Sequence, residues 1–207
     1  MPLSTKRWPL KFYEIAKKHY TTSMANTERE MIYTKSYLSP LGAMTLACNA
    51  SAIIGLWFNG QKHFATVLQG RQVSQSQNHP LLEMATRWLD IYFSGHNPDF
   101  LPPLKYDSTP FKTRVCQIML TIPYGRTMTY GEIAKQIAQE RGVEKISGQA
   151  VGGAVAHNPI SLMIPCHRVV GANGKLTGYA GGLERKEKLL ALEQLHRNFT
   201  CKYCKTE

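Results

Sequence analysis

The sequence of 207 residues contains no hydrophobic run of the roughly 20 residues that a membrane-spanning helix requires. Its beginning also lacks the apolar stretch of a secretory signal, because Lys11, Glu14 and Lys17 interrupt it. Cysteine is scarce: the five cysteines are an odd number, scattered along the chain, and they do not form the pattern of a disulfide framework. These absences predict a cytoplasmic protein with reduced thiols and no membrane contact.

Acidic residues are also few, with 14 Asp and Glu against 25 Lys and Arg and a formal net charge of +11. The surplus is greatest after residue 106, where 14 basic residues stand against 8 acidic ones. A basic C-terminal half indicates a polyanionic partner such as nucleic acid. A merely basic soluble protein would give the same count, so charge alone leaves both interpretations open.

Composition divides the chain into four segments. Residues 1–30 are a basic extension that we expect to be weakly ordered. Residues 31–106 read as a small strand-rich N-terminal α/β domain, with three candidate strands, a hairpin signal at Asn59-Gly60 and then a helix with apolar residues at spacings of three and four. Residues 107–196 form a second domain, and residues 197–207 are a tail.

The second domain begins with signals for three successive helices. Thr109-Pro110 suits a helix start, Thr129 to Glu132 has the spacing of a capping box, and Ser147 can cap a third helix. A hairpin is then expected around the turn at residues 171–174, where a winged helix carries its wing. The predicted fold class is therefore α+β with two domains, the second a winged-helix-like DNA-binding domain.

The segment Ile164–Val170 contains a cysteine followed directly by a histidine, Cys166 and His167. Cysteine is a nucleophile only as the thiolate, and an imidazole can take its proton. Adjacent side chains do not point the same way in a helix or a strand, so a productive pair needs a tight turn or a bridging water. From spacing alone, such a dipeptide is more often incidental than catalytic.

The surrounding residues make this segment specific. Asn158-Pro159 precedes it, and Gly178–Gly182 and Lys186 follow it. Together these residues resemble the O6-alkylguanine-DNA alkyltransferases, also called methylated-DNA–protein-cysteine methyltransferases. The resemblance is specific over residues 107–196 and looser over residues 31–106. It implies single, irreversible transfer of a methyl or other alkyl group from O6-alkylguanine in DNA, with O4-alkylthymine as a further candidate substrate, by a monomeric suicide enzyme that needs no cofactor.

The resemblance also implies residue roles. Cys166 is the alkyl acceptor, His167 its base through a water molecule, and Glu193 the carboxylate that orients the histidine. Independently, helical spacing places Glu193 on an apolar stripe beside Leu189, where a carboxylate needs a partner. A salt bridge to Lys186 or to another basic residue is the alternative explanation for that carboxylate.

Further positions match the family's substrate and DNA contacts. The residues implied to bind the target nucleotide are Tyr130, Asn158, Val169 and Tyr179. Those implied to contact DNA are Gln149, Ala150, Gly152 and Gly153. Two glycines inside a helix are unfavourable by about 1 kcal/mol each relative to alanine, so they need a reason. Close approach of DNA is one reason, and tight helix packing is the other.

Three positions depart from the family pattern. Gln149 stands where many members have an arginine that fills the gap left by the flipped base, and Ser161 and Ala180 stand where some have proline and serine. Some relatives bind zinc through N-terminal cysteines, but residues 31–106 contain only Cys48, so we expect no metal site. Two rival functions stay open: a non-catalytic lesion sensor or winged-helix regulator, and a Cys-His hydrolase that turns over.

Overall fold

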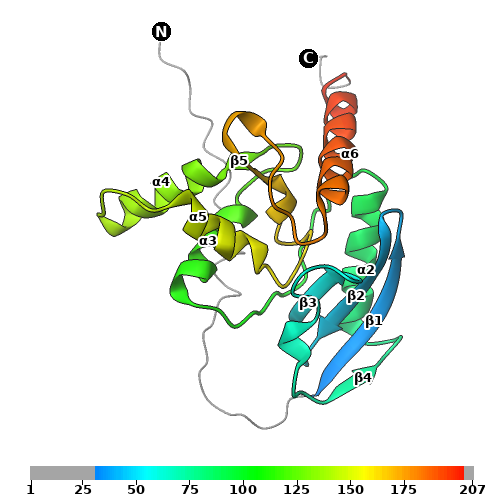
Figure 1. The fold of residues 1–207 in the computed structure, drawn as a ribbon. Coiled ribbons are helices and arrows are strands. Elements are labelled where there is room, and N and C mark those ends of the chain that lie inside the picture. Colours follow the sequence, from blue (N-terminus) through cyan, green and yellow to red (C-terminus); the bar gives the residue numbers. More distant parts are fainter. Residues whose placement is uncertain (1–30, 203–207) are drawn as a thin grey trace.

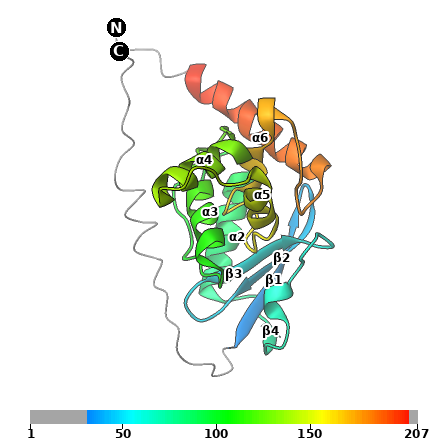
Figure 2. The same ribbon diagram turned by 60° about the vertical axis from the view of Figure 1, so that its left-hand side comes forward.

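The computed structural model describes residues 31–202, and the side chains of residues 31–195. The basic extension expected at residues 1–30 lies outside the described residues. The two halves of the described chain pack side by side, a sheet with one helix against it and a group of helices (Figures 1 and 2). No helix among the described residues is long and apolar enough to cross a bilayer.

The N-terminal half is built on a four-stranded mixed sheet with the order β3-β2-β1-β4. Its strands are β1 (Ile32–Ser39), β2 (Gly42–Cys48), β3 (Ile53–Phe58) and β4 (Val73–Gln75). The first three form an antiparallel meander, whereas β4 pairs in parallel with β1. The hairpin predicted at Asn59-Gly60 is therefore wrong. The chain turns there, with Gly60 at φ 77°, but continues through the short helix η1 (Thr66–Leu68) to the opposite edge of the sheet.

Helix α2 (Pro80–Phe93) packs against this sheet with an apolar stripe. The His79 imidazole caps it by accepting a hydrogen bond from the amide of Leu81, and Pro80 supplies a pre-formed first turn. Its buried residues follow spacings of three and four: Leu82, Ala85, Trp88, Leu89 and Tyr92. The stripe was predicted from this periodicity.

The C-terminal half contains four α-helices: α3 (Pro110–Leu120), α4 (Tyr130–Arg141), α5 (Gly148–Ala156) and α6 (Leu183–Lys202). The predicted caps are confirmed, because the side chains of Thr109, Thr129 and Ser147 each accept a hydrogen bond from the first turn of the following helix.

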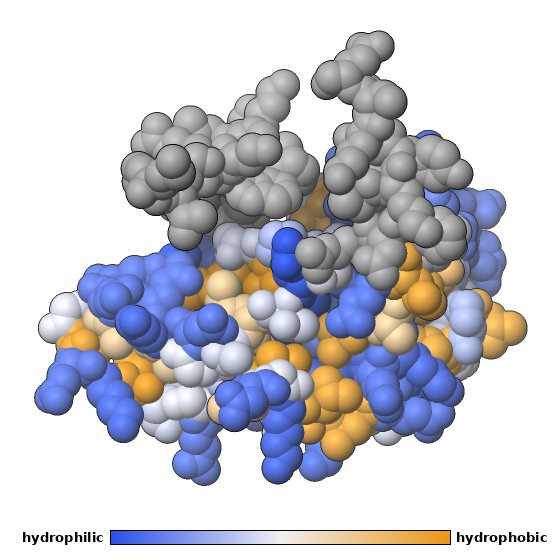
Figure 3. Space-filling model, turned by 90° about the horizontal axis from the view of Figure 1, so that it is seen from above, coloured by the Kyte–Doolittle hydropathy of each residue, from blue (hydrophilic) through white to orange (hydrophobic). Residues whose placement is uncertain are grey.

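Seen from above, hydrophilic side chains project around the periphery, with apolar residues between them (Figure 3).

The predicted wing hairpin is not formed. Strand β6 (Val169–Val170) pairs instead with β5 (Met128–Thr129), and in parallel. Residues 171–175 form a closed turn around η3 (Ala172–Gly174), but residues 176–177 are not in a strand. The C-terminal half is thus a helical domain with one short strand pair.

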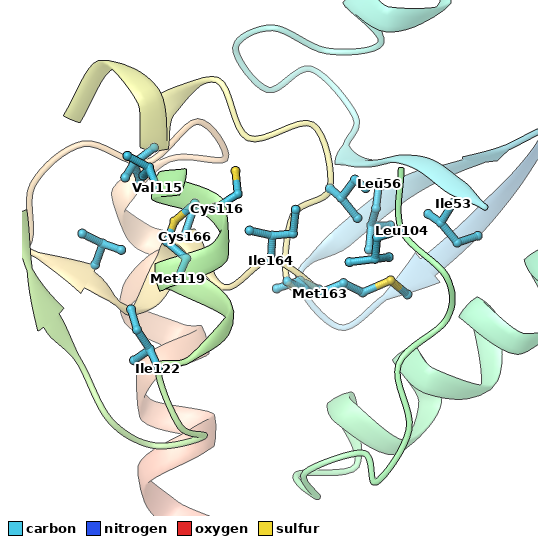
Figure 4. Close-up of a cluster of buried hydrophobic side chains, with 14 of the residues drawn as sticks. Ile53, Leu56, Leu104, Val115, Cys116, Met119, Ile122, Met163, Ile164 and Cys166 are labelled. Atoms are coloured by element: carbon cyan, nitrogen blue, oxygen red, sulfur yellow. The ribbon is translucent and has the colours of Figure 1, made fainter. Parts of the chain in front are cut away.

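The two halves share one core. Residues of the C-terminal half form backbone hydrogen bonds with the outer edge of β3. The Leu56 amide donates to the Pro159 carbonyl at 3.0 Å, and the Ser161 amide donates to the Leu56 carbonyl at 2.8 Å. Figure 4 shows the apolar side chains running from Leu56 through Ile164 to Cys166. The segment that leads to Cys166 is therefore anchored on the N-terminal sheet.

Candidate active site and DNA interface

Cys166 begins a single 3-10 turn, η2 (Cys166–Arg168), between the anchored segment and β6. Pro165 precedes the turn with a non-helical ψ of 63°. The tight turn that the Cys-His dipeptide requires is thus present. The Cys166 side chain is almost fully buried, with 4% of its surface exposed. Among the described residues no group of His, Cys, Asp and Glu side chains could hold a metal ion.

Asn158 is the neighbour of the sulfur. Its Nδ2 donates to Cys166 Sγ at 3.1 Å and to the Ile164 carbonyl at 2.8 Å, while its Oδ1 accepts from the Ile160 amide. Burial raises the pKa of the Cys166 thiol, and the Asn158 hydrogen bond and the nearby Lys186 charge partly oppose that rise. Anion-stabilising groups therefore surround a sulfur that needs a base to become a thiolate.

His167 and Glu193 form a completely buried pair. His167 Nε2 lies 2.7 Å from Glu193 Oε1, and neither side chain is exposed. Burial lowers the pKa of His167 against the opposing pull of Glu193, so the imidazole is neutral near pH 7. Nε2 carries the proton, since it faces a carboxylate, which leaves the lone pair on Nδ1. That Nδ1 atom is buried without a protein partner.

Glu193 is held by three further groups. Arg168 donates to both carboxylate oxygens at 3.0 Å, the Gly125 amide donates to Oε2 at 2.8 Å, and the Tyr92 hydroxyl donates to Oε1 at 2.8 Å. Gly125 has a φ of 69°, a conformation that favours glycine. Although burial opposes ionisation, His167 and Arg168 bring the pKa of Glu193 to about 2. The carboxylate is thus fixed and ionised.

Lys186, one alternative partner for Glu193, forms its hydrogen bonds with backbone carbonyls instead. The Lys186 ammonium donates to the backbone carbonyls of Val169 at 2.5 Å, Thr177 at 2.8 Å and Gly178 at 3.4 Å. Burial lowers the pKa of this lysine to about 8. Lys186 therefore fixes the segment that follows β6, and the partners of the Glu193 carboxylate are His167 and another basic residue, Arg168.

Sequence reasoning missed two members of this cluster. Arg168 lies within the motif Ile164–Val170, directly after His167, and binds the same carboxylate. Tyr92 lies 75 residues before His167, on the apolar stripe of α2, and its oxygen is 3.2 Å from His167 Nε2. No local pattern links the two, because a tyrosine on such a stripe reads as a core residue.

A groove of about 680 Å³ lies between α5 and the segment that follows β6. The residues of the buried cluster do not line it, but Tyr130 and Tyr179 do, and both lie close enough to Cys166 to interact with its charge. Among the residues singled out from the sequence, the groove is lined by Tyr130, Gln149, Gly152, Gly153 and Tyr179. Ala180 lines it as well. Most of the predicted substrate and DNA contacts thus share one groove, with three departures. Val169 and Asn158 are buried and Ala150 is exposed, and none of the three is among the lining residues.

The side chains along this groove are held in place. The Tyr130 hydroxyl donates to the carbonyls of Thr177 and Gly178 at 3.2 and 3.3 Å. The Tyr179 hydroxyl is buried, and burial raises its pKa well above the usual value. Ser161 is almost fully buried, with its hydroxyl 3.5 Å from Gln61 Oε1. The wall of the groove that Tyr130 forms is therefore fixed by hydrogen bonds to the opposite segment.

The two glycines of α5 are not required by packing within the protein. A Cβ atom added at Gly152 would meet only the Tyr130 ring, at an ordinary 3.9 Å, and one added at Gly153 would meet nothing within 4 Å. Both glycines line the groove. Of the two reasons for these glycines, tight helix packing is therefore excluded for the described residues, and approach by something outside the protein remains.

Comparison with known proteins matches both halves. The family model of the 6-O-methylguanine DNA methyltransferase DNA binding domain matches residues 110–195, and that of the ribonuclease-like domain of the same family matches residues 32–106. Curated methylated-DNA–protein-cysteine methyltransferases from Mycolicibacterium paratuberculosis and Methanosarcina acetivorans are each 40% identical; the matches cover 80% and 78% of this chain and 94% and 98% of theirs.

Among solved structures, the Mycobacterium tuberculosis OGT in complex with DNA is 39% identical, with a TM-score of 0.69, over 79% of this chain and 93% of that one. Identity at this level over most of both chains, together with a match to each half, leaves no ambiguity of family. The chain belongs to the O6-methylguanine DNA methyltransferase family.

Proposed function

We propose that this chain, a methylated-DNA–protein-cysteine methyltransferase, repairs DNA alkylation damage by moving the alkyl group of O6-alkylguanine onto Cys166. The observation that carries the assignment of the acceptor is the linkage of Asn158, Cys166, His167 and Glu193 in one buried cluster beside the groove. The whole cluster comes from a single chain, so the proposed reaction needs no second subunit, in keeping with a protein that acts as a monomer.

In the proposed step, His167 Nδ1 takes the proton of the Cys166 thiol through one water molecule. Glu193 stabilises the imidazolium that forms and keeps the ring in the correct tautomer. The thiolate then attacks the alkyl carbon, so that an S–C bond forms while the O6–C bond breaks. The electron pair of the broken bond goes to the guanine, which takes up one proton, and the His167 imidazolium gives up the proton that came from the thiol and returns to its neutral form. No step regenerates the thiol.

The target oxygen is inaccessible inside a duplex, so the nucleotide must leave the base stack, which costs a few kcal/mol. The groove between α5 and the segment after β6 is the proposed entrance. Tyr130 is proposed to act on the target phosphate, Tyr179 to form a wall of the base pocket, and Gln149 to occupy the gap in the stack. Gly152 and Gly153 support this placement, because only an external surface explains their lack of side chains.

The test uses a duplex that contains O6-methylguanine with a labelled methyl group. One labelled methyl group per chain, located on Cys166 by mass spectrometry, is the expected result, and Cys166→Ala should lose it while keeping DNA affinity. Cys48→Ala is a matched control, because Cys48 is also buried but lies in β2. No transfer would favour the sensor, and repeated turnover would favour the hydrolase. The same assay with O4-methylthymine tests the second substrate.

A further inference from the structure

The loop that follows β3 meets the end of helix α5 through two histidines. The rings of His63 and His157 stack, with centroids 4.1 Å apart and planes 29° apart. His63 has a φ of 58°, a left-handed conformation that is unfavourable for a residue other than glycine. The amide of the preceding Lys62 donates to the Ala180 carbonyl at 3.1 Å. An N-terminal loop is thus held, with local strain, against the DNA-binding half.

This loop continues the exposed face of α5. Gln149, Gly153 and Ala156 follow one another at spacings of three and four and line the groove, and His157 comes next at the end of the helix. Lys62 and His63 line the same groove. The surface that holds the predicted DNA contacts therefore extends past the end of α5 and onto the N-terminal half.

The extension lies in a region of positive charge. Lys62 and His63 are exposed, and partial burial and the neighbouring charges of His157, Lys62 and Lys112 lower the pKa of His63. On the other side of His157 lies a second hollow of about 430 Å³, lined by Lys112 and by Arg71. Asp107 is the one acidic side chain among the described residues that line either hollow, and it lies 3.5 Å from Arg71. Lys62, His63 and His157 therefore gather without an acidic partner there.

We propose that Lys62, His63 and His157 bind phosphate groups of the DNA backbone next to the flipped nucleotide, so that the DNA interface extends across both halves of the protein. The inference rests on the proposed function, since that function places DNA along α5. Lysine acts on a phosphate as a point charge, and imidazole nitrogens can donate to it. His157 uses Nδ1 to donate to the Gly153 carbonyl at 2.7 Å, so its Nε2 is the atom that faces the phosphate, and Nε2 donates to it only when the ring is an imidazolium.

The first test compares Lys62→Ala with Lys105→Ala on an unmodified duplex, so that no alkyl transfer occurs. Lys105 is an exposed lysine of the same half that lines neither hollow. Each phosphate contact that is lost should reduce the slope of log affinity against log salt by about 0.9. We expect that reduction and a several-fold loss of affinity for Lys62→Ala, and the wild-type slope for Lys105→Ala. An unchanged slope in Lys62→Ala, or an equal loss in both variants, overturns the inference.

A second test uses pH. The groups that face the stacked pair are Lys62 and Lys112 beside His63, and Arg71 and Asp107 across the second hollow. Protonation of His63 adds charge where a phosphate would lie, and its lowered pKa places that protonation below about pH 6.5. Wild-type affinity should therefore rise as the pH falls from about 7 to about 5, and His63→Gln should lose at least part of that rise. The same rise in His63→Gln would contradict the inference. Methyl transfer by the wild type, measured in parallel, reports on the proposed function separately.

Discussion

The Tyr92 hydroxyl donates a 2.8 Å hydrogen bond to Glu193 Oε1 from a different half of the molecule. Tyr92 belongs to α2, which packs on the N-terminal sheet, whereas Glu193 belongs to α6 near the end of the described chain. Both are fully buried. The same tyrosine oxygen is 3.2 Å from His167 Nε2, so the N-terminal half contributes directly to the pair that we propose activates Cys166.

Replacement Tyr92→Phe removes only that hydroxyl. Hydrogen bonds to charged groups contribute about 1.5–3 kcal/mol, so a fall of about tenfold in the single-turnover methyl-transfer rate, near 1.4 kcal/mol, is expected. The acid limb of the pH–rate profile should also move to higher pH, because the carboxylate that loses a donor attracts the imidazole proton more strongly. A purely structural role would not move that limb.

Tyr37→Phe is the matched control. The Tyr37 hydroxyl also hydrogen-bonds to a carboxylate, Asp90 of α2, at 2.9 Å, but on an exposed surface. Its loss should leave the transfer rate and the pH profile unchanged. If both variants slow transfer equally, the effect comes from α2 and not from the buried cluster.

Glu193→Gln should change how stability depends on pH. The folded-state pKa of Glu193 is about 2, below its ordinary 4.5, so this group adds stability above pH 4.5 that is lost as pH falls toward 2. At 1.36 kcal/mol per pKa unit, the contribution is at most about 3 kcal/mol. Urea unfolding of both proteins should show their free energies of unfolding converging between pH 4.5 and pH 2. A constant difference over that range would contradict the assignment.

The sequence predicted the features that depend on local chemistry. The helix caps at Thr109, Thr129 and Ser147 need only a side chain next to the first turn, and the motif around Cys166 is contiguous. The failed hairpin at Asn59-Gly60 shows the limit. A turn dipeptide permits a reversal but does not supply a partner strand, and the following residues pair elsewhere.

Contacts between distant residues could not be predicted. Tyr92 contacts His167, and His63 stacks on His157, although the residues of each pair are far apart in the sequence. These elements are brought together because β3 pairs with the chain before Cys166. Helical spacing did show that Glu193 needed a partner, but it could not choose between His167, Lys186 and another basic residue, which the structure shows to be Arg168. That choice depends on where the carbonyls that hold Lys186 lie in space.

A chain that starts at Met31 should transfer methyl groups at close to the full-length rate. Every proposed catalytic and DNA contact lies after that residue, and the two family matches span residues 32–106 and 110–195. Single-turnover rates on the same duplex measure this directly. A fall of tenfold or more, about 1.4 kcal/mol of barrier, would show that the basic extension takes part in the reaction or in DNA binding.

Gln149 provides the most specific test of base flipping. It lies on the exposed first turn of α5 and lines the groove. The hydrogen bond described for it uses its backbone amide, so its side chain is available to reach into the stack. An arginine there would fill the gap with a planar charged group, whereas glutamine offers only a neutral amide. Gln149→Arg should therefore maintain or raise the transfer rate on duplex DNA, and Gln149→Ala should lower it.

The free modified base separates the possible roles of Gln149, since that substrate needs no flipping. If Gln149 fills the gap, the loss in Gln149→Ala should appear on the duplex and largely vanish on free O6-alkylguanine. Gln72→Ala, at an exposed glutamine outside the groove, should change neither rate. Equal loss on both substrates would place Gln149 in the base pocket or the fold. Absence of any loss would mean that another residue, Tyr130 foremost, keeps the nucleotide out of the stack alone.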